Sequence, residues 1–309
     1  MLSRRWFAAT AVLGTAYSLQ SAQMPGEQQA AFRTTSNLVL LEVSVLDANG
    51  VPVAGLEKQN FQIKESGRPR QISHFATGAE QVCVGLLVDF SRSMRAQQEL
   101  VSSAVAQFSA RLQPADELFL VLFNESILVE SEPKLLAGTK PQEVANVISS
   151  TRPDGQTALY DALLKGAELS RRGSLSRRVL VILSDGADTA SRASLEDAIA
   201  AIHSSNLLIY TVGMPARGTV SSGLGVLKRL AESTGGFTVA DPGPEALSLF
   251  FDRVSADIRA RYVIGYMAVE PPPGKTETRS LSVDIVHPPV RSIRIKARKK
   301  YRIQATGVL

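Results

Sequence analysis

The sequence predicts an α/β domain with a doubly wound, mostly parallel sheet, inserted in a small, discontinuous, all-β sandwich-like domain. An unbroken apolar run at residues 82–88 and a nearly all-apolar stretch at residues 178–183 are typical of strands that are buried on both faces of a parallel sheet. Strands of this kind alternate with helical patterns, as a doubly wound fold requires. Strand patterns before and after this region are each too short to close a core alone, so we expect the two flanking segments to pair with each other.

Length and composition allow two domains of unequal size. The chain has 309 residues, of which 44% are hydrophobic and 20% are charged. Such a chain can bury a core of about 150–200 residues beside a smaller domain, and it is not a disordered polyelectrolyte. From the N-terminus we predict an export signal, a flexible segment, the first part of the β domain, the α/β domain, the second part of the β domain and a tail. Their bounds are residues 1–23, 24–36, 37–79, 80–258, 259–303 and 304–309.

The individual elements follow from periodicity and turn residues. Ser194 with Asp197 forms a capping box before one predicted helix, and Gly235 ends the next one. Strands are predicted at residues 38–46, 61–64, 71–75, 82–88, 118–123, 178–183, 207–212, 237–239, 261–267, 279–286 and 292–297. Helices are predicted at about residues 97–111, 141–149, 158–171, 195–205, 224–234 and 244–261.

The N-terminal residues have the features of an export signal. Arg4 and Arg5 precede an apolar run at residues 6–19, which is shorter than the about 20 apolar residues of a membrane span. The paired arginines are typical of a twin-arginine signal, and an ordinary secretory signal is the alternative. We see no second hydrophobic segment long enough to anchor the chain. We therefore expect an exported protein, periplasmic or extracellular, whose mature chain has no stable membrane span.

Charge and cysteine content narrow the function further. The formal net charge of +5 is too mild to favour nucleic acid, which usually needs clustered Lys and Arg with a reading element. The longest basic stretch, residues 291–302, alternates apolar residues with charges and favours a half-exposed strand; a patch for an anionic partner is the alternative. The single cysteine, Cys83, lies in an apolar run and is expected to be a buried, inert thiol.

Polar side chains follow two of the most apolar strands, at the point where each strand ends. These strands run into Asp89 and Asp185, and ligands of open α/β sheets bind beyond the carboxyl ends of the strands. On an extended chain Ser91 and Ser93 share the side of Asp89, and Thr157 adds a hydroxyl just before a helix. Two carboxylates and three hydroxyls suit a hard cation, Mg²⁺ first, with Mn²⁺ or Ca²⁺ as alternatives.

Each of these motifs alone has a simpler interpretation. Ser93 or Thr157 could cap the helix that follows it, and Asp185 could belong only to a turn. The joint pattern favours one site, because an apolar strand precedes each aspartate. Asp161 lies one helical turn after Thr157 and is a candidate for holding the Thr157 loop in place without binding the ion itself. Asp188 is a candidate for holding the loop before the next helix.

Three motifs, in a fixed order along the chain, carry a resemblance to a known family. They are DFSRS at residues 89–93, TALYDA at 157–162 and LSDG at 183–186. Together they resemble the metal-ion-dependent adhesion site of von Willebrand factor type A (VWA) domains, and the match extends over about residues 81–254. The resemblance implies a Rossmann-like VWA fold and a cation that captures an Asp or Glu carboxylate of a protein partner. The cation ligands that it implies are Asp89, Ser91, Ser93, Thr157 and Asp185.

The flanks resemble a bacterial group, the VWFA-related proteins first described from acidobacteria. The matching features are residues 39–43 and 262–266, followed by Arg298 and Tyr301. One departure from the VWA pattern precedes Thr157, where the family often has Gly-Gly and this chain has Gly-Gln. The departure can alter the shape of the loop but removes no ligand.

The leading hypothesis is a secreted, metal-dependent binding module that is not an enzyme. The histidines His74, His203 and His287 fall outside the three motif loops, and we find neither a nucleophile elbow nor a phosphate-binding loop. Metal-assisted hydrolysis needs a base beside the ion, and no residue in the motifs suits that role. The alternatives are an envelope assembly or scaffold protein with a structural metal, and a metal-assisted hydrolase.

Overall fold

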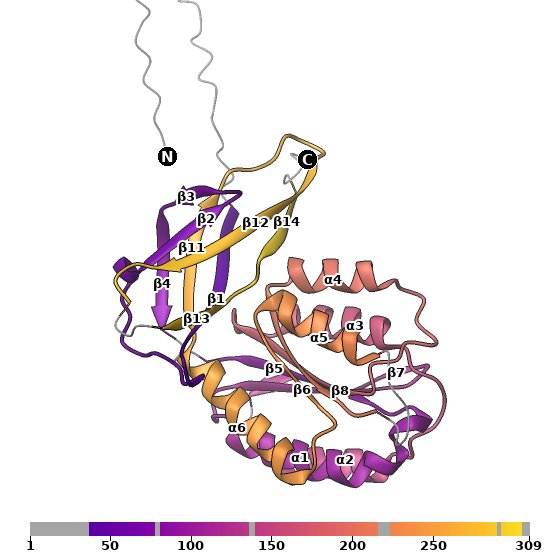
Figure 1. Ribbon diagram of the computed structural model, residues 1–309. Coiled ribbons are helices and arrows are strands. Elements are labelled where there is room, and N and C mark those ends of the chain that lie inside the picture. Colours follow the sequence, from indigo (N-terminus) through magenta and orange to yellow (C-terminus); the bar gives the residue numbers. More distant parts are fainter. Residues whose placement is uncertain (1–36, 78–80, 136–139, 216–222, 289–291, 305–309) are drawn as a thin grey trace, which may run out of the picture. The chain divides into compact units, whose positions relative to one another are not determined.

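The computed structural model describes residues 37–77, 81–135, 140–215, 223–288 and 292–304 (Figure 1). The predicted export signal, the predicted flexible segment and the end of the predicted tail lie outside these residues. The domain limits predicted at residues 80 and 258 stay predictions.

The central element is a six-stranded sheet with the strand order β10-β9-β8-β5-β6-β7. All neighbouring strands are parallel except β6 and β7, which are antiparallel. Every residue of β5 is buried, as the unbroken apolar run at residues 82–88 predicts, and every residue of β6 and β9 is buried as well. The strands are β5 (Cys83–Asp89), β6 (Glu117–Phe123), β7 (Ile127–Leu135), β8 (Arg178–Ser184), β9 (Leu207–Gly213) and β10 (Thr238–Ala240).

Helices cover both faces of this sheet, so the predicted doubly wound fold is confirmed. Figure 1 shows α1, α2 and α6 on one face and α3, α4 and α5 on the other, and each group shares a hydrophobic cluster with the sheet. Within the described ranges, no helix combines the length and apolar character that crossing a membrane requires. The helices are α1 (Gln98–Arg111), α2 (Pro141–Ser150), α3 (Leu159–Arg172), α4 (Leu195–Ser204), α5 (Gly223–Thr234) and α6 (Pro244–Ala260).

Local signals in the sequence set several of these boundaries. Ser194 accepts a hydrogen bond from the backbone N–H of Asp197, and the reciprocal bond is also present, so the predicted capping box is confirmed. Gly235 follows α5 with φ +89°, a conformation that glycine adopts without strain.

Cys83 is buried, and burial, with the nearby charge of Glu117, raises the pKa of its thiol to about 12.

The segments before and after the α/β region form one sandwich, as predicted. It consists of two antiparallel sheets, with the orders β13-β1-β11-β4 and β14-β12-β2-β3. In each sheet, strands from the N-terminal segment pair with strands from the C-terminal segment. The strands are β1 (Asn37–Asp47), β2 (Phe61–Glu65), β3 (Arg68–Arg70), β4 (Ile72–Thr77), β11 (Tyr262–Ala268), β12 (Thr276–Ile285), β13 (Ile293–Lys296) and β14 (Lys300–Gln304).

The half-exposed strand predicted at residues 292–297 of the basic stretch is confirmed as β13, whereas the strand that follows it, β14, was not predicted. The chain leaves β13 after Lys296 and enters β14, which belongs to the other sheet. Arg298, between the two strands, is buried and donates hydrogen bonds to the side chain of Asn206 (2.7 Å) and to the carbonyl of Leu40 (2.8 Å). Contacts with residues that are distant in sequence therefore hold Arg298 between the two strands.

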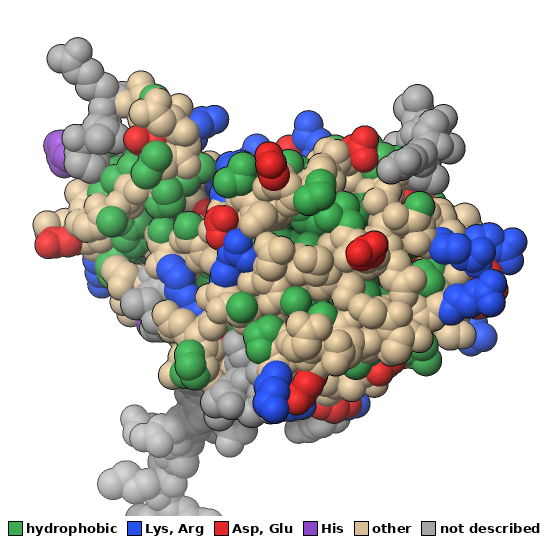
Figure 2. Space-filling model, turned by 90° about the horizontal axis from the view of Figure 1, so that it is seen from below, with side chains coloured by type: hydrophobic (Ala, Val, Ile, Leu, Met, Phe, Trp, Pro, Cys, Tyr) green, Lys and Arg blue, Asp and Glu red, His purple; other side chains and the backbone are tan. Residues whose placement is uncertain are grey.

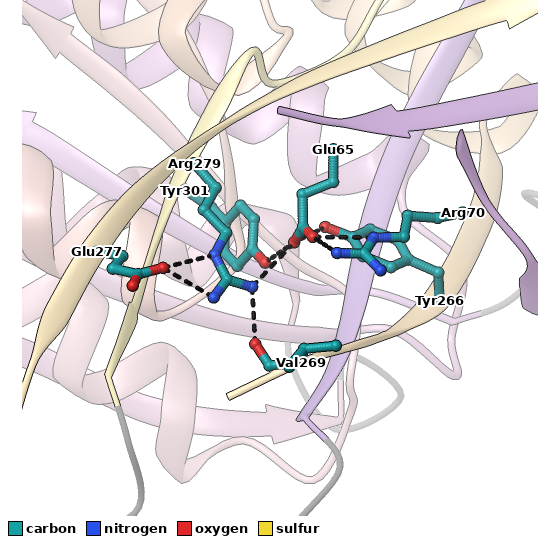
Figure 3. Close-up of polar contacts among 7 residues, drawn as sticks. All are labelled: Glu65, Arg70, Tyr266, Val269, Glu277, Arg279 and Tyr301. Atoms are coloured by element: carbon teal, nitrogen blue, oxygen red, sulfur yellow. Dashed lines mark hydrogen bonds and ion pairs between the residues drawn. The ribbon is translucent and has the colours of Figure 1, made fainter. Parts of the chain in front are cut away.

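A buried glutamate connects the two sheets of the sandwich (Figure 3). Glu65 on β2 is 2% exposed and accepts hydrogen bonds from Tyr266 on β11 (2.9 Å) and from Tyr301 on β14. Arg70 (2.9 Å from Nε) and Arg279 also contact its carboxylate. Burial alone would raise the pKa of Glu65, but the hydrogen bonds from these neighbours lower it below its usual range, so the group remains an anion in the core.

A second buried network joins the α/β region to the sandwich. Arg261, at the end of α6, is 0% exposed and donates through Nε to Asp257 (2.9 Å). Asp257 also accepts hydrogen bonds from Tyr210 on β9 (2.6 Å) and from Ser44 on β1 (2.8 Å). These bonds satisfy a charge pair that would be costly if either partner were missing.

Candidate metal site

Two parallel strands bring the predicted aspartates to the same edge of the sheet. β5 and β8 are neighbours, with Val88 opposite Leu183, so the next residues are Asp89 and Ser184. The Ser184 hydroxyl donates a hydrogen bond to Oδ2 of Asp89 (2.6 Å), and Asp185 follows directly. Asp89 is 1% exposed and Asp185 is 8% exposed, so both carboxylates are largely removed from water.

The DFSRS motif folds back on itself after its aspartate. Oδ1 of Asp89 accepts a hydrogen bond from the backbone N–H of Ser91 (2.9 Å), and the hydroxyls of Ser91 and Ser93 lie 3.0 Å apart. The chain is extended only as far as Ser91, because a 3₁₀ helix (Arg92–Gln97) begins at the next residue. The serines therefore meet through a helical turn, not along the extended chain that the sequence analysis assumed, and Ser93 lies inside the 3₁₀ helix and does not cap it.

Backbone hydrogen bonds hold the second loop against the first. The N–H of Asp154 donates to the carbonyl of Phe90 (3.0 Å), and the N–H of Arg92 donates to the carbonyl of Gly155 (3.2 Å). These bonds place the segment that leads to Thr157 beside the DFSRS motif.

The third loop holds the backbone of Thr157. The N–H of Thr157 donates to the Thr189 hydroxyl (3.0 Å), and its carbonyl accepts a hydrogen bond from the N–H of Thr189 (2.8 Å). Thr157 is 4% exposed. The N-cap residue of α3 is Ala158, and no side chain caps this helix, so the alternative interpretation of Thr157 as a helix cap is wrong.

Asp161 and Asp188 connect the loop after β8 to the start of α3. Asp161 accepts a hydrogen bond from the backbone N–H of Ala193 (3.0 Å). Asp188 accepts one from the N–H of Tyr160 (3.2 Å) and one from the hydroxyl of Ser191 (2.5 Å). Their bonds go to the loop backbone and to Ser191, so their geometry fits support of the loops.

Burial and charge make Asp89 the most perturbed carboxyl of the group. Burial raises its pKa, hydrogen bonds from Ser184 and Ser91 lower it, and the neighbouring charge of Asp185 raises it again, with a net value of about 6. The guanidinium of Arg92 pairs instead with Asp154 (3.0 Å), and its side chain is 74% exposed.

The chemistry of the donor set fits a hard divalent cation. The five predicted residues offer carboxylate and hydroxyl oxygens, the ligand type that Mg²⁺, Ca²⁺ and Mn²⁺ prefer. Across the described part of the chain, no cluster of three or more His, Cys, Asp or Glu side chains is placed to hold a metal. Any ion here would therefore depend on the hydroxyls as well as on Asp89 and Asp185.

Three polar residues that support this region, Ser184, Thr189 and Glu125, were not among the residues predicted from the sequence. Ser184 and Thr189 hold the predicted ligands Asp89 and Thr157, and Glu125 in the β6–β7 turn binds the loop before Thr157. Ser184 carried a usable signal, since it is a hydroxyl at the end of an apolar strand directly before an aspartate. The contact between Glu125 and Gln156 depends on which strands are neighbours in the sheet, and no local sequence pattern predicts it.

Known structures of similar fold include the von Willebrand factor type A protein from Catenulispora acidiphila, with 14% identity and a TM-score of 0.50 over 88% of this chain and 74% of that chain. BatB from Bacteroides thetaiotaomicron, a conserved hypothetical protein, has 16% identity and a TM-score of 0.46 over 57% of this chain and 98% of its own. The PilB minor pilin from Streptococcus sanguinis has 16% identity and a TM-score of 0.46 over 60% and 63% of the two chains. At these identities the likeness concerns the fold alone.

Family comparison agrees with the fold and with the position of the three loops. No curated protein matches the sequence. The model of the von Willebrand factor type A domain matches residues 84–253, more than half of the chain. The match begins in β5, before Asp89, and ends in α6, so it includes every predicted ligand. The chain belongs to the von Willebrand factor type A domain family.

Proposed function

We propose that this protein is an exported, metal-dependent protein-binding module, in which a divalent cation captures an acidic side chain of a partner. Mg²⁺ is the preferred ion, with Mn²⁺ or Ca²⁺ as alternatives. One observation carries the proposal: backbone and side-chain hydrogen bonds bring three separate loops together at the carboxyl ends of β5 and β8. The proposed ligands are Asp89, Ser91, Ser93, Thr157 and Asp185.

The charge balance of these ligands explains why an acidic partner would bind. Asp89 and Asp185 supply the only formal charges of the proposed set, and the three hydroxyls are neutral. Two carboxylates at most balance the charge of a bound dication, and five oxygens leave at least one of its coordination positions open, to which the ion would attract a carboxylate of the partner. The burial of both aspartates keeps this attraction in a region of low dielectric, where it is stronger than in water.

The distribution of charged side chains on the surface favours a protein partner over a nucleic acid. On the face drawn in Figure 2, Lys and Arg side chains occur in separate groups with Asp and Glu among them, unlike the continuous basic patch that nucleic acid requires. We also propose that the protein is a member of the acidobacterial VWFA-related group and that its N-terminal signal directs its export.

An enzymatic role finds less support. His74 lies on β4 and His287 follows β12, both in the sandwich, and His203 lies near the end of α4. None of them belongs to the three loops of the site, and a metal-assisted hydrolase needs a base beside the ion. The second candidate is a scaffold protein whose metal only stabilises the loops. The contacts between Thr157 and Thr189 already join two of these loops, and an ion bound beside them would strengthen that connection.

Chelation distinguishes a binding module from a scaffold. Binding of the purified chain to an array of Asp- and Glu-containing peptides should require Mg²⁺ and should be lost in excess chelator. A variant of the site, Ser91→Ala, should bind more weakly, whereas Ser248→Ala, a serine on α6, should behave as the parent chain. Peptide binding that persists in chelator contradicts the proposal. Metal-dependent melting without peptide binding favours the scaffold.

A further inference from the structure

The turn between β6 and β7 forms hydrogen bonds with the loop that contains Thr157. Glu125 Oε2 accepts a hydrogen bond from the backbone N–H of Gln156 (2.6 Å), and the Asn124 carbonyl accepts one from the N–H of Ala158 (2.7 Å). The residues before and after Thr157 are therefore both tied to this turn. Thr157 itself, whose backbone is also held by Thr189 of the third loop, lies between these two residues in the chain.

We infer that Glu125 is a positioning residue of the proposed metal site: its carboxylate fixes Gln156 and thereby the hydroxyl of Thr157. The inference rests on the proposed function, because it assigns a task to a residue outside the proposed ligand set. The side chain of Glu125 is exposed, so it is not part of the hydrophobic core of the domain. Its effect should appear in metal affinity more than in overall stability.

The glycine before Gln156 makes this contact possible. Gly155 has φ +81°, which other residues rarely adopt. A Cβ atom at this position would lie 1.7 Å from Oε2 of Glu125, so the carboxylate occupies the space that any side chain at position 155 would need. The loop thus depends on glycine for its backbone conformation and for the close approach of Glu125.

This arrangement also accounts for the departure from the Gly-Gly pattern before the threonine. At Gln156 the contact to Glu125 uses the backbone N–H, which every residue except proline offers. The side chain of Gln156 is exposed and does not enter this contact. A glutamine can therefore stand where the family often has its second glycine.

Paired substitutions separate the hydrogen bond from the charge. In Glu125→Ala the acceptor is lost, and the affinity for Mn²⁺, measured by calorimetry, should fall about three- to tenfold, the range that one hydrogen bond supports. Glu125→Gln keeps a side-chain carbonyl acceptor and should stay within about twofold of the parent chain. Glu130→Ala removes an exposed glutamate from the same hairpin and serves as the matched control, with unchanged affinity.

A double-mutant cycle tests the contact itself. Gly155→Ala should weaken Mn²⁺ binding in the parent chain, because the new Cβ displaces the exposed Glu125 carboxylate from Gln156 and strains the backbone at φ +81°. In the Glu125→Ala background the new Cβ no longer clashes with a carboxylate, so Gly155→Ala should cost only the free energy of the strained backbone conformation. The two effects should therefore be less than additive, whereas residues without contact give additive effects.

The possible outcomes are distinct. Equal Mn²⁺ affinity for Glu125→Ala and the parent chain overturns the inference and leaves the proposed function standing. If Glu125→Gln loses as much affinity as Glu125→Ala, the charge matters and the positioning account is wrong. Additive effects in the cycle also overturn it. If the parent chain binds none of Mg²⁺, Mn²⁺ and Ca²⁺, the proposed function fails, and the inference fails with it.

Discussion

Removal of the Ser184 hydroxyl should destabilise the domain more than the loss of an ordinary buried serine. Ser184 is 0% exposed; its hydroxyl donates to Asp89 Oδ2 (2.6 Å) and accepts from the N–H of Gly186 (2.9 Å). In Ser184→Ala the buried carboxylate loses a donor and the buried N–H loses its acceptor. Both groups then lie where water is largely excluded.

The magnitude follows from the two bonds. A hydrogen bond to a charged group contributes about 1.5–3 kcal/mol, and one between neutral groups contributes about 0.5–1.5 kcal/mol. Ser184→Ala should therefore lower the free energy of unfolding by about 2–4.5 kcal/mol. Ser170→Ala is the matched control: Ser170 is also 0% exposed, but its hydroxyl makes one bond, to the carbonyl of Gly166 (2.6 Å). Its loss should cost about 1 kcal/mol.

Urea unfolding followed by circular dichroism, in the presence of chelator, measures both variants. The slope of the free energy against urea should stay constant, since the surface exposed on unfolding does not change. A loss for Ser184→Ala that is no larger than the loss for Ser170→Ala would refute the reasoning, because the hydroxyl would then not support the buried carboxylate.

Two further predictions concern other buried groups. Glu65→Gln should lower the free energy of unfolding by about 3–5 kcal/mol, because the buried arginine contacts lose their anion; Glu277→Gln, at a more exposed contact of Arg279, should cost less in the same urea assay. The pKa of His203 is lowered to about 4 by burial and by repulsion from Arg298 and Arg302, so the unfolded chain binds more protons below about pH 6.5. The stability of the parent chain should therefore fall relative to His203→Gln by up to about 1.4 kcal/mol per pH unit between about pH 6.5 and 4, and parallel stability curves would contradict this.

The fold could be predicted where one physical rule controls a whole segment. Strands β5 and β8 are covered by helices on both faces, and only such burial explains why nearly all of their residues are apolar. The pairing of the flanking segments followed because neither could close a core alone. β7 was missed although its described residues alternate between half-buried and exposed, because Pro133 and several charges interrupt the apolar pattern.

The parts of the site that escaped prediction depend on contacts between distant residues. The side chains of Asp89 and Asp185 end apolar strands, so their place at the sheet edge follows from topology. Glu125 reaches Gln156 only because the β6–β7 turn lies beside the second loop. The same limit applies to Arg298, whose hydrogen-bond partners, Asn206 after α4 and Leu40 on β1, lie far from it in the sequence.

The most direct test of the central claim is a calorimetric titration of the chain with Mg²⁺ and Mn²⁺ beside Asp89→Asn. This substitution keeps the size of the buried side chain and removes its charge, and Asp284→Asn, on β12 of the sandwich and 52% exposed, is the control. We expect one saturable site in the parent chain and in the control, with about 2.7 kcal/mol of added stability at a hundredfold excess over Kd, and no site in Asp89→Asn. A parent chain that binds neither ion, or an Asp89→Asn variant that binds as well as the parent, would contradict the claim that the three loops form a metal site.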